Sequence, residues 1–99
     1  MEEEIKRNYI IELYDIYGSL LTEKQRSYFE DYYFMDLSIG EMAENYGISR
    51  NGVFDQIKRA VNALEDYENH LHLHKKIKKI DSMEIESNLK EELLNLLKE

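Results

Sequence analysis

Apolar residues recur along most of the chain at alternating intervals of three and four positions, the period of an amphipathic α-helix. The first such stretch runs to about Leu20 or Leu21, and its apolar positions are Ile5, Tyr9, Leu13, Ile16, Tyr17 and Leu20. The chain has no proline and only four glycines, so long helices can continue without interruption. The pattern therefore predicts an all-α protein.

Two polar stretches predict where the next helices begin. "TEKQ" at 22–25 and "SIGE" at 38–41 both match a capping box, in which a Ser or Thr and a Gln or Glu three positions later cap each other's backbone N–H. The first opens an aromatic-rich helix that reaches about Met35. The second opens a helix that ends near Gly47, which can adopt the left-handed conformation of a helix C-cap. Ser49 can then cap the helix that follows.

The stretch from Leu37 to Ala60 has the layout of a helix-turn-helix. Ala43 is small where the second helix must cross the first, Gly47 provides a tight turn, and apolar residues can pack the two helices together. The stripe of the second helix continues beyond the motif at heptad-like spacing, through Val53, Ile57, Ala60, Leu64, Tyr67 and Leu71. This predicts an extended fourth helix that packs against the first helix or a second copy of the chain.

A basic cluster and a leucine-rich tail follow the extended helix. Asp81 and Glu84 form a cap-like pair before a short C-terminal helix lined by Ile85, Leu89, Leu93, Leu96 and Leu97. We expect a helical domain over residues 1–79 and a helical tail over residues 80–99. The apolar stripe from Val53 to Leu71, which we call the seam, the aromatic residues and the leucine-rich tail together supply more apolar surface than one small core can bury. We therefore expect a homodimer.

The formal net charge of −8 is unevenly distributed. Residues 1–37 carry four basic and nine acidic side chains, whereas residues 38–63 carry three of each. The acidity therefore lies outside the helix-turn-helix, which is neutral. Contacts with phosphates supply most nonspecific affinity for DNA, so a neutral reading surface is unusual.

The outward face of the helix after Ser49 carries the candidate contacts with nucleic acid. Their side chains suit bases or phosphates, and they are Arg50, Asn51, Lys58 and Arg59. Phe54 and Asp55 share this face and are candidates for contact with a partner. An exposed ring suits a protein surface or a stacked RNA base, and Asp55 would repel phosphate although it could accept a hydrogen bond from cytosine. The alternative is that the face is only solvated.

A second basic candidate is "KKIKK", which supplies Lys75, Lys76, Lys78 and Lys79. Four lysines within one and a half helical turns could bind RNA or phosphate. The alternative, equally weighted, is a solvated helix end whose positive charge complements the helix dipole.

Several functional classes are not expected. The chain has no cysteine, which excludes disulfides, thiol chemistry and cysteine-based zinc sites, and it has no Gly-rich phosphate loop or recognisable nucleophile–base motif. His70 and His74 lie one turn apart but have no evident third ligand, so we expect no metal, no cofactor and no enzymatic activity. No apolar run reaches membrane-spanning length and no secretory signal is evident, so we expect a cytoplasmic protein without membrane contact.

The stretch from Leu21 to Ala60 resembles region 4 of bacterial sigma factors, the domain that binds the −35 promoter element. The matching positions are Leu21-Thr22, Gln25-Arg26, Ala43-Glu44, Gly47-Ile48-Ser49, Val53 and Arg59-Ala60. The match departs at Phe54, Asp55 and Gln56, where sigma-like helices usually carry basic or polar residues. This departure argues against promoter reading.

A closer resemblance covers Tyr9 to about Ile77. "YGSLLTEKQRSY", "DYY", "SRNGVFDQIKR" and "LEDYE" are similar to the YlxM family, small helix-turn-helix proteins of Firmicutes and mycoplasmas. Genes of that family typically lie beside those of the signal recognition particle GTPase and its receptor. The resemblance therefore implies an accessory role in that targeting pathway, and it implies no catalytic residues.

Together these observations predict a sigma-region-4-like trihelical core of the winged-helix-like DNA-binding superfamily type, with an N-terminal helix, an extended fourth helix and a C-terminal tail helix. The leading interpretation is a non-enzymatic accessory or regulatory protein that binds nucleic acid, either the signal recognition particle RNA or DNA. One alternative is a protein-interaction module that binds the targeting GTPase without nucleic-acid contact. Another is a promoter-binding transcriptional regulator.

Overall fold

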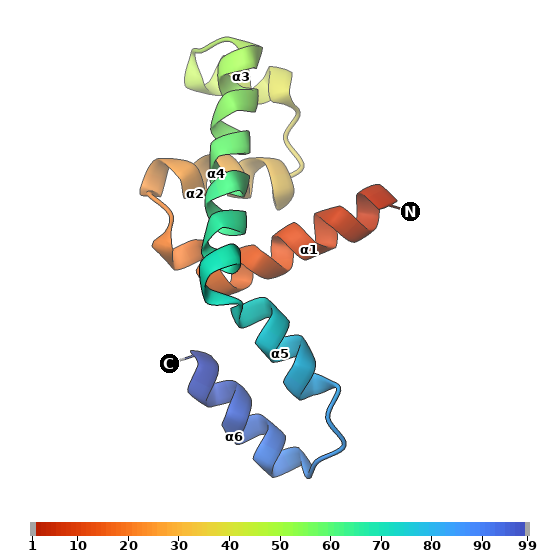
Figure 1. Ribbon diagram of the computed structural model, residues 1–99. Helices are drawn as coiled ribbons and strands as arrows, with labels where there is room; N and C mark the ends of the chain where they lie inside the picture. The colour runs from red at the N-terminus through yellow and green to blue at the C-terminus, as the bar shows by residue number, and fades with distance from the viewer. Residues whose placement is uncertain (1, 99) are drawn as a thin grey trace.

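The computed structural model describes residues 2–98, and over these residues the chain is helical throughout, with short connections. The elements are α1 (Glu2–Tyr17), the 3₁₀ turn η1 (Gly18–Leu20), α2 (Glu23–Tyr33), α3 (Ile39–Tyr46), α4 (Arg50–Leu71), α5 (Leu73–Asp81) and α6 (Ser87–Lys98). Helices α1, α2 and α3 pack around α4, and α5 and α6 form a hairpin that extends away from them (Figure 1). The predicted all-α fold is confirmed.

The predicted caps define the starts of α2, α3 and α4. Thr22 and Gln25 make both bonds of a capping box, and so do Ser38 and Glu41. Ser49 Oγ accepts a hydrogen bond from the N–H of Gly52 at 3.0 Å. These side chains satisfy backbone N–H groups that have no partner within a helix, so each helix begins at a defined residue.

The turn of the helix-turn-helix depends on a left-handed residue. Gly47 ends α3 with φ of 67°, a conformation that costs an L-residue with a Cβ about 1–2 kcal/mol. Its N–H points back to the carbonyl of Glu44 at 3.3 Å, and the N–H of Ile48 bonds the carbonyl of Ala43 at 3.1 Å. These bonds close the end of α3 and direct the chain into α4.

The first helix is shorter than predicted, and its buried face is different. α1 ends at Tyr17 because the chain tightens into η1. Its buried side chains are Ile10, Leu13 and Tyr17, while Ile5, Tyr9 and Leu20 of the predicted apolar face are exposed. α1 crosses the bundle at an angle, and its N-terminal half projects beyond α4 (Figure 1). Apolar side chains of that half, such as Ile5, therefore stay exposed to solvent.

The long helix α4 joins two hydrophobic clusters. Val53 and Ile57 pack with Tyr28 and Met42 between α2, α3 and α4. One turn further on, α4 packs on α1 and α2 in a cluster made of Ile10, Leu13, Tyr17, Leu21, Phe29, Ala60 and Leu64. The predicted seam is therefore used within the chain as far as Leu64. Beyond it, Glu68 takes the buried position, Tyr67 is half-buried and Leu71 is exposed.

The C-terminal third differs most from the expectation. α4 ends at Leu71. The next residue, His72, has φ of 56°, and its N–H donates a hydrogen bond to the carbonyl of Glu68 at 2.8 Å. The basic cluster then forms a separate helix, α5, which ends at Asp81. The predicted cap-like pair of Asp81 and Glu84 is wrong, because α6 begins only at Ser87. α6 packs alongside α5 (Figure 1).

Replacing Gly47 should destabilise the fold through its backbone alone. No atom lies within 4 Å of the position that a Cβ would occupy, so Gly47→Ala adds no clash. We expect it to lower the free energy of unfolding by about 1 kcal/mol, because alanine tolerates the left-handed region poorly. Urea unfolding followed by circular dichroism measures this. Gly47→Asn is the control and should cost less, since asparagine adopts this conformation more readily. Equal stability of Gly47→Ala and the wild type would contradict the account.

Candidate nucleic-acid interface

The candidate contacts lie on the solvent face of α4, the second helix of the helix-turn-helix. Burial of Val53, Ile57 and Ala60 turns the opposite face outward. That face exposes all the residues predicted for it, namely Arg50, Asn51, Phe54, Asp55, Lys58 and Arg59, and it also exposes Asn62. The part of α4 that carries them lies beside α3, at the end of the bundle away from α5 and α6 (Figure 1). The fold therefore gives α4 the exposure that a recognition helix requires.

Arg50 lies against the start of α3 rather than extending freely into solvent. One of its guanidinium nitrogens is 3.1 Å from the position of a Cβ built on Gly40, so only a glycine allows this approach without a shift. The cation therefore lies beside the N-terminal turn of α3, whose N–H groups also carry partial positive charge. This combination suits an anionic group better than it suits a base edge.

An ion pair reduces the positive character of the helix surface. Nε of Arg59 lies 3.0 Å from Oδ2 of Asp55, one turn away, and both side chains are more than half exposed. Such exposed pairs typically contribute about 0–1 kcal/mol, so a phosphate can compete for the guanidinium at small cost. Lys58 makes no ion pair among the described residues.

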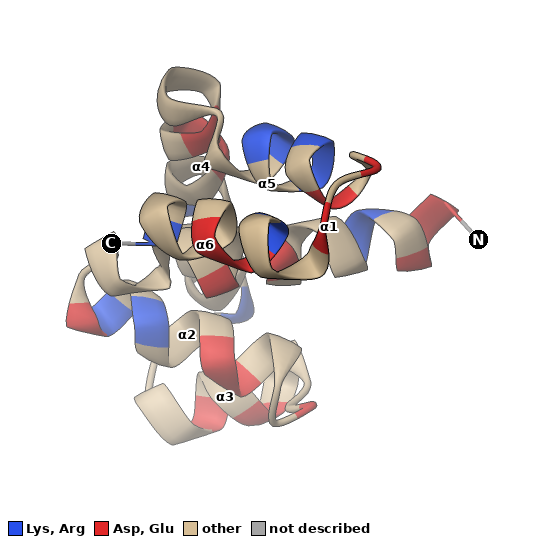
Figure 2. Ribbon diagram, turned by 90° about the horizontal axis from the view of Figure 1, so that it is seen from below, with Lys and Arg blue, Asp and Glu red and all other residues tan. Residues whose placement is uncertain are grey.

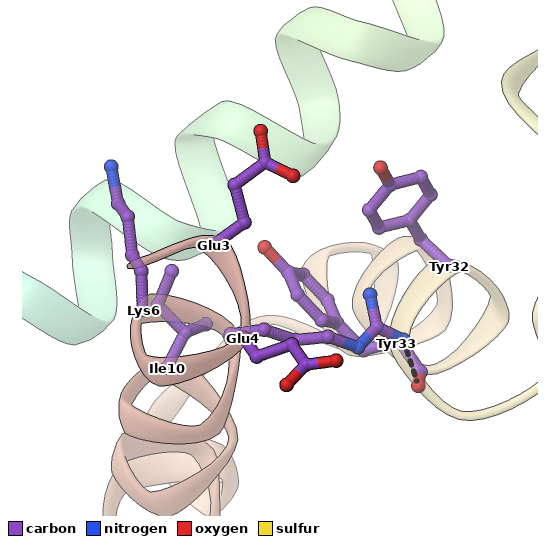
Figure 3. A pocket seen from close by; sticks show the side chains of 7 residues that line it. Glu3, Glu4, Lys6, Ile10, Tyr32 and Tyr33 are labelled. Carbon is purple, nitrogen blue, oxygen red and sulfur yellow. Dashed lines mark hydrogen bonds between the residues drawn. The ribbon is translucent and has the colours of Figure 1, made fainter. Parts of the chain in front are cut away.

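The candidate face borders a groove that was not evident from the sequence. Phe54, Lys58 and Asn62 line one side of a hollow of about 320 Å³, and Lys6 of α1 and Tyr32 of α2 line other sides. A second hollow adjoins it between α1 and α2, where Glu3, Glu4, Lys6 and Ile10 lie across from Tyr32 and Tyr33 (Figure 3). The excess of aromatic residues in α2 was the only sequence signal for it. α1 is therefore part of the candidate surface, and Glu3 and Glu4 make that side acidic.

Arg7 fixes α1 against the end of α2 beside this second hollow. Its guanidinium donates a hydrogen bond to the carbonyl of Tyr33 at 2.9 Å, and lies over the Tyr33 ring at 5.0 Å from the centroid. It also approaches Asp36 at 3.7 Å. These contacts satisfy a carbonyl at the end of α2, so Arg7 connects α1 to α2 and is not a free cation for a ligand.

The four lysines of the second candidate cluster all lie on α5, on a different part of the molecule from Arg50 and Lys58 (Figures 1 and 2). Nζ of Lys78 is 3.2 Å from Oε1 of Glu12, so this lysine is paired with α1. Lys75, Lys76 and Lys79 are exposed and make no ion pair among residues 2–98. The structure therefore separates the two basic candidates and leaves three free lysines on α5.

A buried carboxylate sets the direction of α5. Glu68, only 7% exposed, accepts hydrogen bonds from the hydroxyl of Tyr17 at 2.6 Å and from the backbone N–H groups of His74 and Lys75 at 3.0 and 3.2 Å. The carboxylate thus caps the start of α5 from the end of α4. Burial raises the pKa of Glu68, but these three hydrogen bonds lower it more, so the pKa lies below its ordinary value.

Comparison with known proteins also identifies a helix-turn-helix protein. A family model described as "Putative helix-turn-helix protein, YlxM / p13 like" (UPF0122) matches residues 4–99. The chain belongs to this family. It is 45% identical over 97 residues to the UPF0122 protein of Bacillus velezensis, which covers 93% of this chain and 86% of that relative. The predicted resemblance to the YlxM family is confirmed.

Two further UPF0122 proteins are each 53% identical to this chain. The match covers 72 residues in Limosilactobacillus reuteri and 75 residues in Caldanaerobacter subterraneus. In both cases it includes 72% of this chain and 64% of the relative. This UPF0122 chain therefore spans slightly less than two thirds of the length of these relatives.

The histidines of this UPF0122 chain serve structural contacts. Nε2 of His74 lies 2.5 Å from Oε2 of Glu12, and the ring packs edge-on against Tyr9. Nδ1 of His70 lies 2.8 Å from the carbonyl of Asp66. Among residues 2–98, no three His, Cys, Asp or Glu side chains are grouped closely enough to hold a metal ion. Over the same residues, no helix has both the length and the apolar character needed to cross a membrane.

Removing the charge of Glu68 should weaken the junction of α4 and α5 in a pH-dependent way. Because the folded state lowers the pKa of Glu68, its contribution is present above the ordinary value of 4.5 and is lost as pH falls through the folded value. We expect Glu68→Gln to lower the free energy of unfolding by about 1–3 kcal/mol at pH 7. The difference from wild type should shrink as the pH falls toward 3.

Urea unfolding at several pH values measures this difference. Glu65→Gln is the matched control, since Glu65 is an exposed carboxylate one turn earlier on α4, and it should change stability little. A stability loss for Glu68→Gln that stays constant from pH 7 to pH 3 would show that the charge of the carboxylate is not responsible.

Proposed function

We propose that the chain is a non-enzymatic accessory or regulatory protein that binds nucleic acid, with Arg50, Asn51, Lys58 and Arg59 as its contacts. The observation that carries the proposal is the exposed outward face of α4 in a helix-turn-helix, on which these four side chains lie. Lys75, Lys76, Lys78 and Lys79 of α5 are secondary candidates, with Lys78 the weakest because Glu12 already pairs with it.

The surroundings of this face favour structured RNA over duplex DNA. Phe54 is 57% exposed and available for stacking on an unpaired base. Asp55 and the acidic first turn of α1 would repel the closely spaced phosphates of a duplex that engages the whole face. The resemblance to the YlxM family points to the signal recognition particle RNA, and hence to a role in that cytoplasmic targeting pathway. The proposal includes self-association as a homodimer.

Fluorescence anisotropy with three labelled ligands at near-physiological salt tests the proposal. The ligands are the signal recognition particle RNA, an unrelated structured RNA of equal length, and a random DNA duplex. Selective binding of the first supports the RNA-accessory function. Binding of a specific duplex above random DNA, with affinity that falls steeply with salt, would instead favour a promoter-binding regulator. Absence of binding to any of them would reject nucleic-acid binding.

Charge reversal on α4 identifies the contacts. We expect the double variant Lys58→Glu and Arg59→Glu to weaken binding of the RNA by at least about tenfold, since it removes two phosphate contacts and adds repulsion. The control reverses Lys24 and Arg26, two exposed cations at the start of α2, and should keep most of the affinity. Circular dichroism verifies that both variants stay helical. Undiminished binding by the folded Lys58/Arg59 variant would exclude this face.

A protein-interaction module without nucleic-acid contact is the second candidate, and Phe54 is the observation that favours it. Its ring is exposed at the edge of the groove formed with α1 and α2. In that case Phe54→Ala should weaken pull-down of the signal recognition particle GTPase by this chain. Met35→Ala, which removes an apolar side chain that is 67% exposed elsewhere, is the control. Equal recovery of the GTPase by wild type and Phe54→Ala would exclude a contact through Phe54.

A further inference from the structure

The hairpin of α5 and α6 leaves apolar side chains without cover. α6 has twelve residues, five of them leucines, yet neither α5 nor α6 contains a buried residue. Leu89 is 47% exposed and Leu96 is 66% exposed, while Leu93, Leu94 and Leu97 are half-buried. The leucine stripe of α6 is therefore wider than the contact that α5 offers. Full burial of one leucine contributes about 1.5–3 kcal/mol, so this exposure favours a partner.

A hollow beside the hairpin extends the apolar surface. It has a volume of about 510 Å³ and lies between the end of α1, the junction of α4 with α5, and the end of α6. The aliphatic side chains in its lining are Ile16, Leu20, Leu71, Leu73, Ile77 and Leu97. Leu20 and Leu71 are 52% and 44% exposed. The uncovered surface therefore continues from the hairpin to the base of the bundle.

Opposite charges are separated between the two helices of the hairpin. α5 carries four lysines and one aspartate, whereas the stretch from Glu84 to Lys98 carries four glutamates and two lysines. In the ribbon of Figure 2, basic residues are marked on α5, whereas α6 carries both acidic and basic residues. Among residues 2–98, no ion pair joins a lysine of α5 to a carboxylate of α6 or of the loop before it. Each helix thus presents a charge that the hairpin does not neutralise.

We propose that a second copy of this chain covers the hairpin, with the two hairpins packed face to face about a two-fold axis parallel to their helices. In this arrangement α5 of each copy lies antiparallel to α6 of the other, as in a four-helix bundle, and basic side chains meet acidic ones twice. A foreign partner would have to match a basic and an acidic helix at once. A second copy does so by symmetry.

The inference names the surface for the self-association included in the proposed function. Under this inference the free lysines of α5, which are the secondary nucleic-acid candidates of the proposed function, lie in the contact between the two copies instead. Arg50, Asn51, Lys58 and Arg59 lie outside the contact, so each dimer retains two copies of the primary nucleic-acid face.

The first test is the molar mass of the full chain by light scattering and sedimentation, from about 1 to 500 μM. We expect a mass twice the 11.9 kDa of one chain. The double variant Leu89→Lys and Leu96→Lys should raise the dissociation constant at least tenfold. The control replaces Ile5 and Met35 by lysine, residues that are 66% and 67% exposed away from the hairpin, and should dimerise like the wild type. A monomeric wild type, or dissociation by the control and not by the Leu89/Leu96 variant, would overturn the inference.

The second test separates contacts between copies from contacts within one hairpin. One chain carries Lys75→Glu and Lys79→Glu, and the other carries Glu91→Lys and Glu92→Lys. Each alone should dimerise at least tenfold more weakly than the wild type, because like charges then face each other. An equimolar mixture should regain dimers containing one chain of each kind, detected by native mass spectrometry. Failure of the mixture to recover would overturn the pairing of α5 with α6 of the other copy.

The anisotropy assay is then repeated with the monomeric Leu89/Leu96 variant, whose α4 face is unchanged. Loss of dimerisation without loss of RNA binding would leave the proposed function intact. Absence of RNA binding by a wild type that dimerises through the hairpin would reject the proposed function alone.

Discussion

The structure depends on one buried stripe along α4. Val53 and Ile57 pack the helix-turn-helix against α2, and Ala60 and Leu64 pack the same helix on α1 and α2. Because both clusters share one continuous helix, the position of α1 and the exposure of the candidate face of α4 cannot vary independently. Truncating a buried leucine such as Leu64 would typically cost about 2–5 kcal/mol, which is a large part of the stability of a domain this small.

The stripe ends in a polar residue, and this change determines the C-terminal third. Glu68 occupies the position that a fifth apolar residue would take, and its oxygens accept hydrogen bonds from the Tyr17 hydroxyl and the first N–H groups of α5. A buried carboxylate is stable only when its hydrogen bonds are satisfied, so the chain must turn where those N–H groups can reach it. The left-handed His72 allows that turn directly after Leu71. The hydrogen bonds of one carboxylate therefore determine where the lysines of α5 lie.

The sequence predicted the features that local chemistry decides. The two capping boxes, the left-handed Gly47, the Ser49 cap and the inward stripe from Val53 to Leu64 were all correct, because each depends on residues a few positions apart. The break at His72 was missed, since apolar residues continue at helical spacing on both sides and the cause, Glu68, acts through contacts with Tyr17. The groove beside Phe54 was missed for a similar reason. It depends on the angle at which α1 crosses α4, and Arg7 holds that angle through a carbonyl 26 positions away.

The charge distribution limits what the helix-turn-helix can do. Affinity of a recognition helix for any duplex comes largely from phosphate contacts, and here the helix surface offers few free cations. Arg59 forms an ion pair with Asp55, and Arg50 lies against α3. Glu3 and Glu4 line the neighbouring hollow and add negative charge there. A surface of this kind gains little binding affinity from the regularly spaced phosphates of a duplex. Under the proposed function, recognition therefore depends on a few contacts of defined geometry, such as a stacked ring and one or two charges, which suits a ligand of fixed shape. On that proposal, the same acidity that weakens general binding to nucleic acid raises selectivity for a structured partner.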